Sequence, residues 1–254
     1  MRSGTDPARN TADALRSIRE AAGQGAELVA TPEMTTQLDR RRTLPVPPEA
    51  DTLAPFNALA SELGIHILLG STPVRDGDRL RNQSVLLGPS GVLARYTKMH
   101  LFDVDVSETE SWRESATYRA GDAPVTTDVG DVRLGLAICY DLRFPELFRH
   151  YAHEGCQLIA VPAAFTVPTG KAHWHVLLRA RAIETGAFIL APAQGGLHED
   201  GRSTYGHSLV VDPWGEVVAK LAHDEPGILV ADLDLSRVAD ARRRIPAWAQ
   251  EPKF

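Results

Sequence analysis

One cysteine of this chain has the surroundings expected of a nucleophile. Cys139 ends the apolar run 132–138 and is followed at once by the polar, charged and proline-containing stretch 140–146. A short strand that turns sharply into a helix would lift the turn residue to the rim of a sheet, where the next backbone N–H groups point outward. A thiol there can be accessible and acidified. Cys139 is therefore the first candidate for covalent chemistry.

Two further residues gain a role once a thiol nucleophile is considered. Glu33 follows the apolar stretch 28–30, and Lys98 lies among apolar residues after another expected strand. Taken singly, each is more often a solvated surface charge. A thiol that attacks an amide carbon needs a base for its proton and fixed donors for the negative charge on the oxygen. Glu33 could accept the proton, and Lys98 with the backbone N–H of Tyr140 could hold the oxyanion.

The elements that must position these residues alternate between short β-branched runs and helical stretches. We expect strands at 26–30, 65–70, 84–87, 132–138, 158–161, 188–191 and 208–211. We expect helices at 11–24, 52–63, 145–154 and 173–185. This alternation predicts an α/β fold with helices on sheet faces, and the hairpin-like turns at 75–78 and 212–215 predict mixed sheets. Without a repeat or a long linker, residues 1–254 are expected to form one domain.

Composition excludes several classes of function. A net charge of −6 and a pI near 5.8 do not provide the basic face that phosphate contacts need, so no nucleic-acid partner is expected. No apolar run approaches the roughly 18 residues of a membrane span, and the first residues lack a signal-like apolar core, so we expect a cytoplasmic protein without a membrane partner. Cys139 and Cys156 are expected to be reduced, with Cys156 a small core residue.

Three motifs resemble the signatures of the nitrilase superfamily of carbon–nitrogen hydrolases: Pro32-Glu33, 98–103 and 138–146. The resemblance extends over essentially the whole chain. It implies a four-layer αββα sandwich, a Glu-Lys-Cys triad, a thioester intermediate and assembly into homodimers or larger homo-oligomers. No cofactor is expected, and His173 and His175, which are two residues apart on one expected helix, do not indicate a metal site.

The resemblance also implies a role for each residue that matches a motif. Glu33 corresponds to the general base, Lys98 to the residue that stabilises the oxyanion and Cys139 to the nucleophile. Glu114 matches, more weakly, a second glutamate that positions the lysine and the substrate. The expected substrate contacts are Tyr140, Phe165 and Arg202.

Segments 162–174, 178–184 and 193–215 are similar to the branch that contains deaminated glutathione amidase and ω-amidase, and closer to the former. That branch implies a small carboxylate-bearing amide as substrate, with deaminated glutathione favoured. Cationic side chains would bind its carboxylate, with Arg202, Lys171 or Arg143 as candidates. The simpler expectation for Arg143, and for Arg179 and Arg181, is that they hold loops and helix ends.

The sequence leaves three further functions open. The enzyme could be an ω-amidase or a broader short aliphatic amidase, or the chain could be an inactive family member that acts as an interaction protein. The resemblance also implies an apolar first strand, which this chain lacks ahead of Thr5. We therefore expect a version extended upstream to be more stable than the 254-residue chain.

Overall fold

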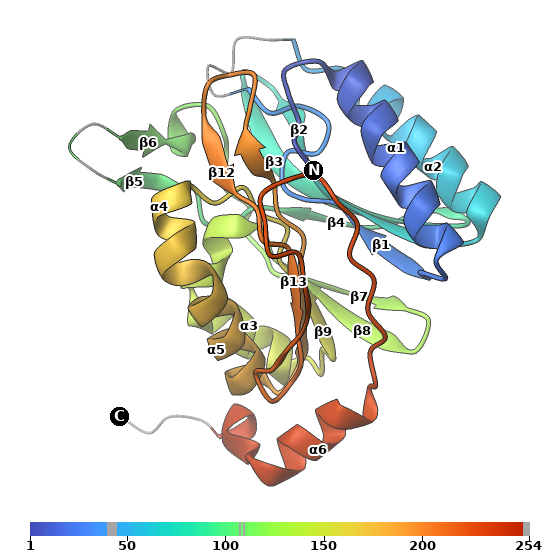
Figure 1. Cartoon of the computed structure of the whole chain (residues 1–254), viewed down its shortest axis with the longest axis vertical. Helices are drawn as coiled ribbons and strands as arrows, with labels where there is room; N and C mark the ends of the chain where they lie inside the picture. Colours follow the sequence, from blue (N-terminus) through green and yellow to red (C-terminus); the bar gives the residue numbers. More distant parts are fainter. Residues whose placement is uncertain (40–44, 107, 109, 251–254) are drawn as a thin grey trace.

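The computed structural model describes residues 1–39, 45–106, 108 and 110–250, and most of their strands form two sheets (Figure 1). The first sheet has the order β1-β2-β3-β4, with β1 Leu28–Ala30, β2 His66–Asp76, β3 Arg79–Gly88 and β4 Gly91–Thr97. The second has the order β14-β13-β10-β9-β8-β7, with β7 Val125–Val129, β8 Val132–Leu136, β9 Leu158–Ala160, β10 Phe188–Ala191, β13 Leu209–Val211 and β14 Val217–Lys220. Two short ribbons add β5 Asp103–Asp105 with β6 Ser111–Arg113, and β11 Gly195–Leu197 with β12 Ser203–Tyr205.

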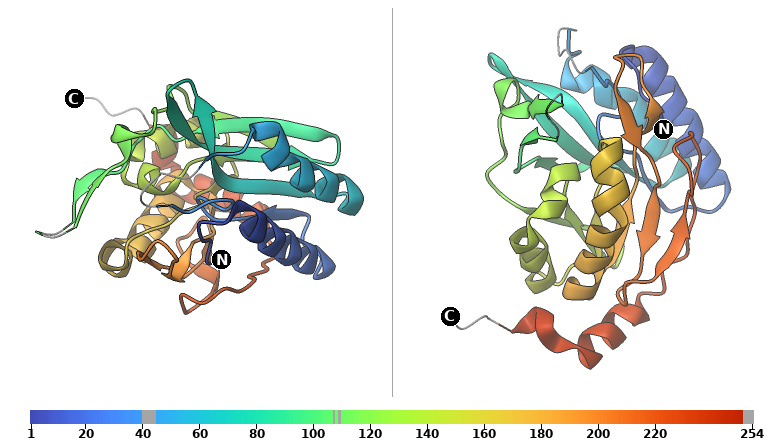
Figure 2. Two further views of the ribbon diagram at one scale, coloured as in Figure 1. Left: turned by 90° about the horizontal axis from the view of Figure 1, so that it is seen from above. Right: turned by 60° about the vertical axis from the view of Figure 1, so that its left-hand side comes forward.

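Helices cover the outer face of each sheet, so that the layers run helix, sheet, sheet, helix (Figure 2). On the first sheet lie α1 Pro7–Gly23 and α2 Glu49–Leu63, and on the second lie α3 Pro145–His153 and α5 His175–Thr185, which follows the short α4 Val167–Thr169. The last helix, α6 Ser236–Arg244, lies beyond the ends of α3 and α5. Parallel and antiparallel pairs occur in both sheets, which confirms the predicted α/β sandwich with mixed sheets. None of the described helices is long and apolar enough to cross a membrane.

Alternation along β2 explains how the first sheet joins two cores. Ile67 and Leu69 point outward and pack with the apolar sides of α1 and α2. Leu68 points the other way, into the core shared with the second sheet. Successive strand residues face opposite sides, so a run of apolar residues serves both layers. Each fully buried leucine or isoleucine contributes roughly 1.5–3 kcal/mol to that packing.

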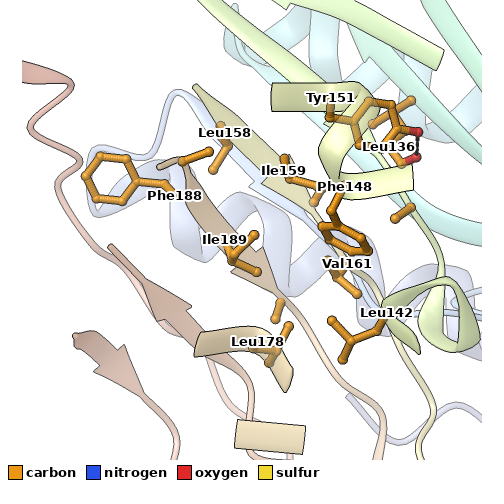
Figure 3. Close-up of a cluster of buried hydrophobic side chains, with 14 of the residues drawn as sticks. Leu136, Leu142, Phe148, Tyr151, Leu158, Ile159, Val161, Leu178, Phe188 and Ile189 are labelled. Atoms are coloured by element: carbon orange, nitrogen blue, oxygen red, sulfur yellow. Dashed lines mark hydrogen bonds between the residues drawn. The ribbon is translucent and has the colours of Figure 1, made fainter. Parts of the chain in front are cut away.

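The second sheet and its helices form the larger core (Figure 3). Phe148 and Tyr151 of α3 pack with Leu136 of β8 and Ile159 of β9, and all four are at most 1% exposed. The Tyr151 hydroxyl donates a hydrogen bond to the Leu136 carbonyl, so its polar end is satisfied inside the core. This packing fixes the end of β8, the strand that leads to Cys139.

β1 lies at the edge of the first sheet, beside a cavity near the N-terminus. This cavity, of about 110 Å³, is lined by Met1, residues 28–32 and the extended segment 227–229, among others. Burial, and then the neighbouring charge of Arg2, lowers the pKa of the Met1 amine to about 6. The expectation that an upstream extension stabilises the protein stays a prediction.

Candidate active site

The turn that carries Cys139 is strained. After β8 the chain passes through Ile138 into the 3₁₀ turn Cys139–Arg143, and Cys139 has a φ of +50°. Positive φ is uncommon for a residue with a side chain, and such strain gathers at functional sites. The Cys139 N–H donates to the Pro162 carbonyl at 2.9 Å. The first N–H groups of a helical turn lack partners within it, so the N–H of Tyr140, the residue after Cys139, is a candidate donor to an anion.

The carboxylate of Asp141 holds this turn in place through hydrogen bonds. It accepts hydrogen bonds from the Ile138 N–H at 2.8 Å and from the His100 N–H at 3.0 Å. The His100 ring lies 2.7 Å from the same carboxylate through Nδ1. Since His100 follows Lys98 by two residues, Asp141 ties the loop that carries the lysine to the turn that carries the cysteine.

Lys98 lies between two carboxylates. Its Nζ is 2.9 Å from Oε1 of Glu33 and 2.9 Å from Oε2 of Glu114. Glu33 follows β1, Lys98 follows β4, and Glu114 opens the 3₁₀ turn Glu114–Ala116. Their side chains are 6%, 2% and 6% exposed. An ammonium has three N–H donors, so one remains for a group bound in the cavity that Lys98 lines.

Opposing effects set the charge states of this cluster. Burial would raise the pKa of Glu33, but the charge and hydrogen bond of Lys98, with hydrogen bonds from Cys139 and Asn82, hold it below its ordinary value. Burial would lower the pKa of Lys98, but the charges of Glu114 and Glu33 raise it well above its ordinary value. The ion pair is therefore the resting state at neutral pH.

The thiol of Cys139 is the opposite case. Burial, and then the charge of Glu33, raises its pKa well above the ordinary value, against the weaker effects of Lys98 and of the Ala164 backbone. The resting nucleophile is thus a neutral thiol. Such a thiol attacks only when a base removes its proton, and Glu33 is the ionised group hydrogen-bonded to it.

Sequence reasoning missed Asn82 of β3. Its Nδ2 donates to Oε1 of Glu33 at 2.9 Å and to Oε1 of Glu114 at 3.2 Å. Its own Oδ1 is buried without a hydrogen-bond partner among the described residues. An orphaned acceptor of this kind costs roughly 1–3 kcal/mol. The available signal was weak, because Asn82 lies in the polar first half of β3, ahead of the expected strand 84–87, although asparagine is depleted in strands.

The four charged and nucleophilic groups open into one cavity of about 60 Å³. Since one water needs roughly 10–15 Å³, this space holds a few waters or a small acyl group. The structure places Tyr140, Phe165 and Arg202 in its lining, beside Phe102 and Trp112. Lys171 is exposed and does not belong to that lining.

Two guanidinium groups also line the cavity. Arg143 lies 5.7 Å from the ring centroid of Tyr140 and 5.5 Å from that of Phe165. Arg202 lies 5.6 Å from the ring centroid of Trp112, with its side chain 17% exposed. Arg143 lines the cavity and also lies 3.3 Å from Nδ1 of His173, so carboxylate binding and a local structural role both stay predictions for it. The expected structural role fits Arg179 and Arg181, which donate to backbone carbonyl oxygens of Gly215 and Leu142.

Within the described part of the chain, no group of three or more His, Cys, Asp or Glu side chains is arranged to hold a metal ion. Cys139 and Cys156 are both free thiols. Cys156 is fully buried, and burial raises its pKa to about 12. A buried thiol of this kind packs like a small apolar side chain.

Comparison with known sequences shows the family. Residues 1–243 match the family model described as carbon-nitrogen hydrolase. An omega-amidase of Homo sapiens is 39% identical over 246 residues, which cover 95% of this chain and 89% of the relative. A deaminated glutathione amidase of Synechocystis sp. is 38% identical over 260 residues, covering 97% of this chain and 94% of the relative. The chain therefore belongs to the carbon–nitrogen hydrolases of the nitrilase superfamily, and both of these relatives are amidases.

Solved structures show the same fold. The C. elegans NitFhit protein matches with a TM-score of 0.89 and 34% identity over 99% of this chain, which spans 63% of that longer protein. Saccharomyces cerevisiae Nit3, a member of branch 10 of the nitrilase superfamily, matches with a TM-score of 0.86 and 29% identity, over 96% of this chain and 91% of that one. A mutant amidase from Nesterenkonia sp. AN1, with acrylamide added at its active-site cysteine, matches with a TM-score of 0.77 and 27% identity, over 97% and 95% of the two chains.

Proposed function

We propose that this protein hydrolyses an amide bond of a small carboxylate-bearing substrate through a thioester on Cys139. The observation that carries the proposal is the meeting of Glu33, Lys98 and Cys139 at one small cavity. The guanidinium groups of Arg143 and Arg202 in the same wall suit a substrate carboxylate, and Arg202 also forms an ion pair with Asp200 at 3.7 Å.

The proposed reaction begins when Glu33 takes the proton of the Cys139 thiol and the sulfur attacks the amide carbon. Lys98 and the Tyr140 N–H hold the oxygen as it becomes negative, and Glu114 keeps the ammonium aimed at it. The carbon–nitrogen bond then breaks, and Glu33 returns the proton to the departing nitrogen. A water attacks the thioester, with Glu33 again as base. The acid leaves, and the thiol regains its proton.

We favour deaminated glutathione as the substrate, with 2-oxoglutaramate as the alternative that would make the protein an ω-amidase. Both carry a 2-oxoglutaryl acyl group, and they differ in the leaving group, which is cysteinylglycine or ammonia. A cavity of about 60 Å³ fits the acyl group, so the leaving group would extend toward the mouth. The two kinds of curated relative, at 38% and 39% identity, support the shared acyl group equally.

A short aliphatic amidase and a non-catalytic interaction protein both account for this site less well. The first would gain nothing from the two guanidinium groups in the cavity wall. The second would have no need for a buried ion pair beside a strained cysteine, an arrangement that costs stability. These features support an active enzyme with a charged substrate.

We further propose that the enzyme works in the cytoplasm as a homodimer or larger homo-oligomer. A reducing compartment keeps a thiol nucleophile such as Cys139 available. The exposed side of α5 carries Val176 and Ile183, which are 66% and 50% exposed and would be covered by a second copy.

The test measures the carboxylic acid released from deaminated glutathione, 2-oxoglutaramate, an aliphatic amide and an aliphatic nitrile. Cys139→Ala serves as the blank, and Cys156→Ala as the matched control that keeps the nucleophile. Release of 2-oxoglutarate from the first two compounds by the wild type and Cys156→Ala alone would support the proposal. The better of the two compounds identifies the leaving group. Equal turnover by Cys139→Ala, or turnover of the neutral amide or nitrile alone, would refute it.

A further inference from the structure

The buried cluster at the cavity has an electrostatic problem. Glu33 and Glu114 bring two carboxylates, Lys98 brings one ammonium, and the Cys139 thiol is neutral in the resting state. Burial by itself favours the protonated form of Glu33, because the carboxylate loses its hydration there. A protonated Glu33 could no longer act as a base.

We propose that Asn82 is the positioning residue that keeps Glu33 ready as a base. Its amide holds both carboxylates on Lys98 through two N–H donors, without adding a charge of its own. A cation at this position would pair with Glu33 and weaken it as a base, whereas an apolar residue would leave it unsupported. This inference rests on the proposed roles of Glu33 and Cys139.

The geometry defines which way the amide points. Nδ2 is the only atom of the Asn82 amide with hydrogens, and its two N–H groups match the two carboxylate oxygens at 2.9 and 3.2 Å. The reversed amide would place Oδ1 against two anions. The orphaned Oδ1 is therefore the consequence of an orientation that the carboxylates impose.

The backbone of Asn82 fixes the third member of the cluster. Its carbonyl oxygen accepts the Lys98 N–H at 2.9 Å, just where β4 ends beside β3. One fully buried residue thus contacts Lys98 through its backbone and both carboxylates through its side chain. In agreement with this, the hydrogen bond from Asn82 is among the contacts that lower the pKa of Glu33.

The test follows the pH dependence of Cys139 alkylation by iodoacetamide, read from intact mass, because it needs no knowledge of the natural substrate. In the wild type, the rate should be level above the pKa of Glu33 and fall at more acid pH as Glu33 takes a proton. Glu33→Gln should lose this level region, because its alkylation depends on the small thiolate fraction, which falls continuously as the pH falls. In Asn82→Ala the fall should move to higher pH by about one unit, since each N–H donor lowers a carboxylate pKa by roughly that amount. In Asn82→Asp it should move further, because a third carboxylate beside Glu33 also raises that pKa. Cys139→Ala gives the background rate.

The matched control is Ser84→Ala, on the same strand and equally buried. Its hydroxyl donates to the Gly70 carbonyl at 2.6 Å and touches none of the cluster. A shift in both Asn82 variants without one in Ser84→Ala supports the proposal. An unshifted profile in a folded Asn82 variant, or an equal shift in Ser84→Ala, overturns it. Failure of both Asn82 variants to fold would assign the residue to stability and overturn it as well. A shift without turnover of the proposed substrates would refute the substrate alone.

Discussion

The hydroxyl of Tyr96 donates a hydrogen bond to the carboxylate of Asp141 across 2.7 Å. Tyr96 belongs to β4 of the first sheet, whereas Asp141 lies in the turn after β8 of the second. Burial and the charge of Asp141 raise the pKa of Tyr96 far above its ordinary value, so the phenol remains a donor at every working pH. This bond joins the two sheets directly behind the nucleophile.

We expect Tyr96→Phe to lower the free energy of unfolding by about 1.5–3 kcal/mol, the range for a hydrogen bond to a charged group. Tyr151→Phe is the matched variant, because that buried hydroxyl donates to the neutral Leu136 carbonyl and should cost only about 0.5–1.5 kcal/mol. Urea unfolding measures both. A larger loss for Tyr151→Phe would contradict the importance given to the Asp141 contact.

The two guanidinium groups of the cavity predict a substrate-dependent defect. Arg143→Leu and Arg202→Leu should each raise KM for 2-oxoglutaramate by roughly 10-fold or more, since a charge-assisted hydrogen bond is worth about 1.5–3 kcal/mol. Their KM for a neutral aliphatic amide should change little. Arg179→Leu, outside the cavity, is the control. Equal effects on charged and neutral amides would remove the arginines from carboxylate recognition.

Gly70 lies where the first sheet meets the segment that leads to Glu33. A Cβ at this position would lie 1.8 Å from the Thr31 carbonyl oxygen and 2.5 Å from that of Pro32. Gly70→Ala should therefore push the 31–33 segment away, with a stability loss of about 1–3 kcal/mol and a roughly 10²-fold fall in turnover if Glu33 moves by about 1 Å. Thermal unfolding and acid release measure the two effects.

Gly23→Ala is the control for Gly70→Ala. It ends α1, and no atom lies within 4 Å of its added Cβ. Its stability should stay within about 0.5 kcal/mol of the wild type, with unchanged turnover. Equal behaviour of the two variants would show that the segment yields to Gly70→Ala at no cost.

The buried His198 ring is expected to lower the free energy of unfolding at acid pH. Its Nδ1 donates to the Ser3 carbonyl, so its Nε2 accepts from the Thr204 hydroxyl. Burial lowers its pKa from 6.5 to about 4, against the opposing effect of the Ser3 bond. Between these values the unfolded chain binds the extra proton, so this contribution is fully present above pH 6.5 and is lost as the pH falls toward 4.

The loss linked to His198 should reach roughly 3 kcal/mol. Urea midpoints of the wild type and of His198→Gln, compared along the same acid series, isolate it from other titrating groups. The difference between the two proteins should shrink as the pH falls. Parallel curves would show that the ring is protonated in the fold without penalty.

The sequence predicted the helices and strands better than it predicted how they pack together. Strong apolar periodicity indicated α2 and α5 within a few residues of their observed ends, and hairpin turn residues indicated the mixed sheets. β4 and α6 were missed, because β4 is an edge strand in which only Tyr96 is buried and α6 is rich in arginine. Their positions depend on packing partners that no local pattern contains.

Some residues of the candidate site could also be predicted from the sequence, and others could not. Glu33, Lys98 and Cys139 could be named because each follows an apolar run and has a residue type that the chemistry requires. Asn82 could not, since its role depends on two carboxylates that lie 32 and 49 residues away in sequence. The place of Arg143 in the cavity wall could not be predicted either, because the direction of a side chain from a tight turn is set by the tertiary structure.

The base and the nucleophile are held by different sheets of the molecule. Glu33, Asn82 and Lys98 are held by the first sheet, and Cys139 by the second. A slip of one sheet past the other by a single residue, about 3.3 Å, would part them while leaving every helix and strand intact. The catalytic rate therefore reports the relative position of the two sheets, including displacements that circular dichroism does not register.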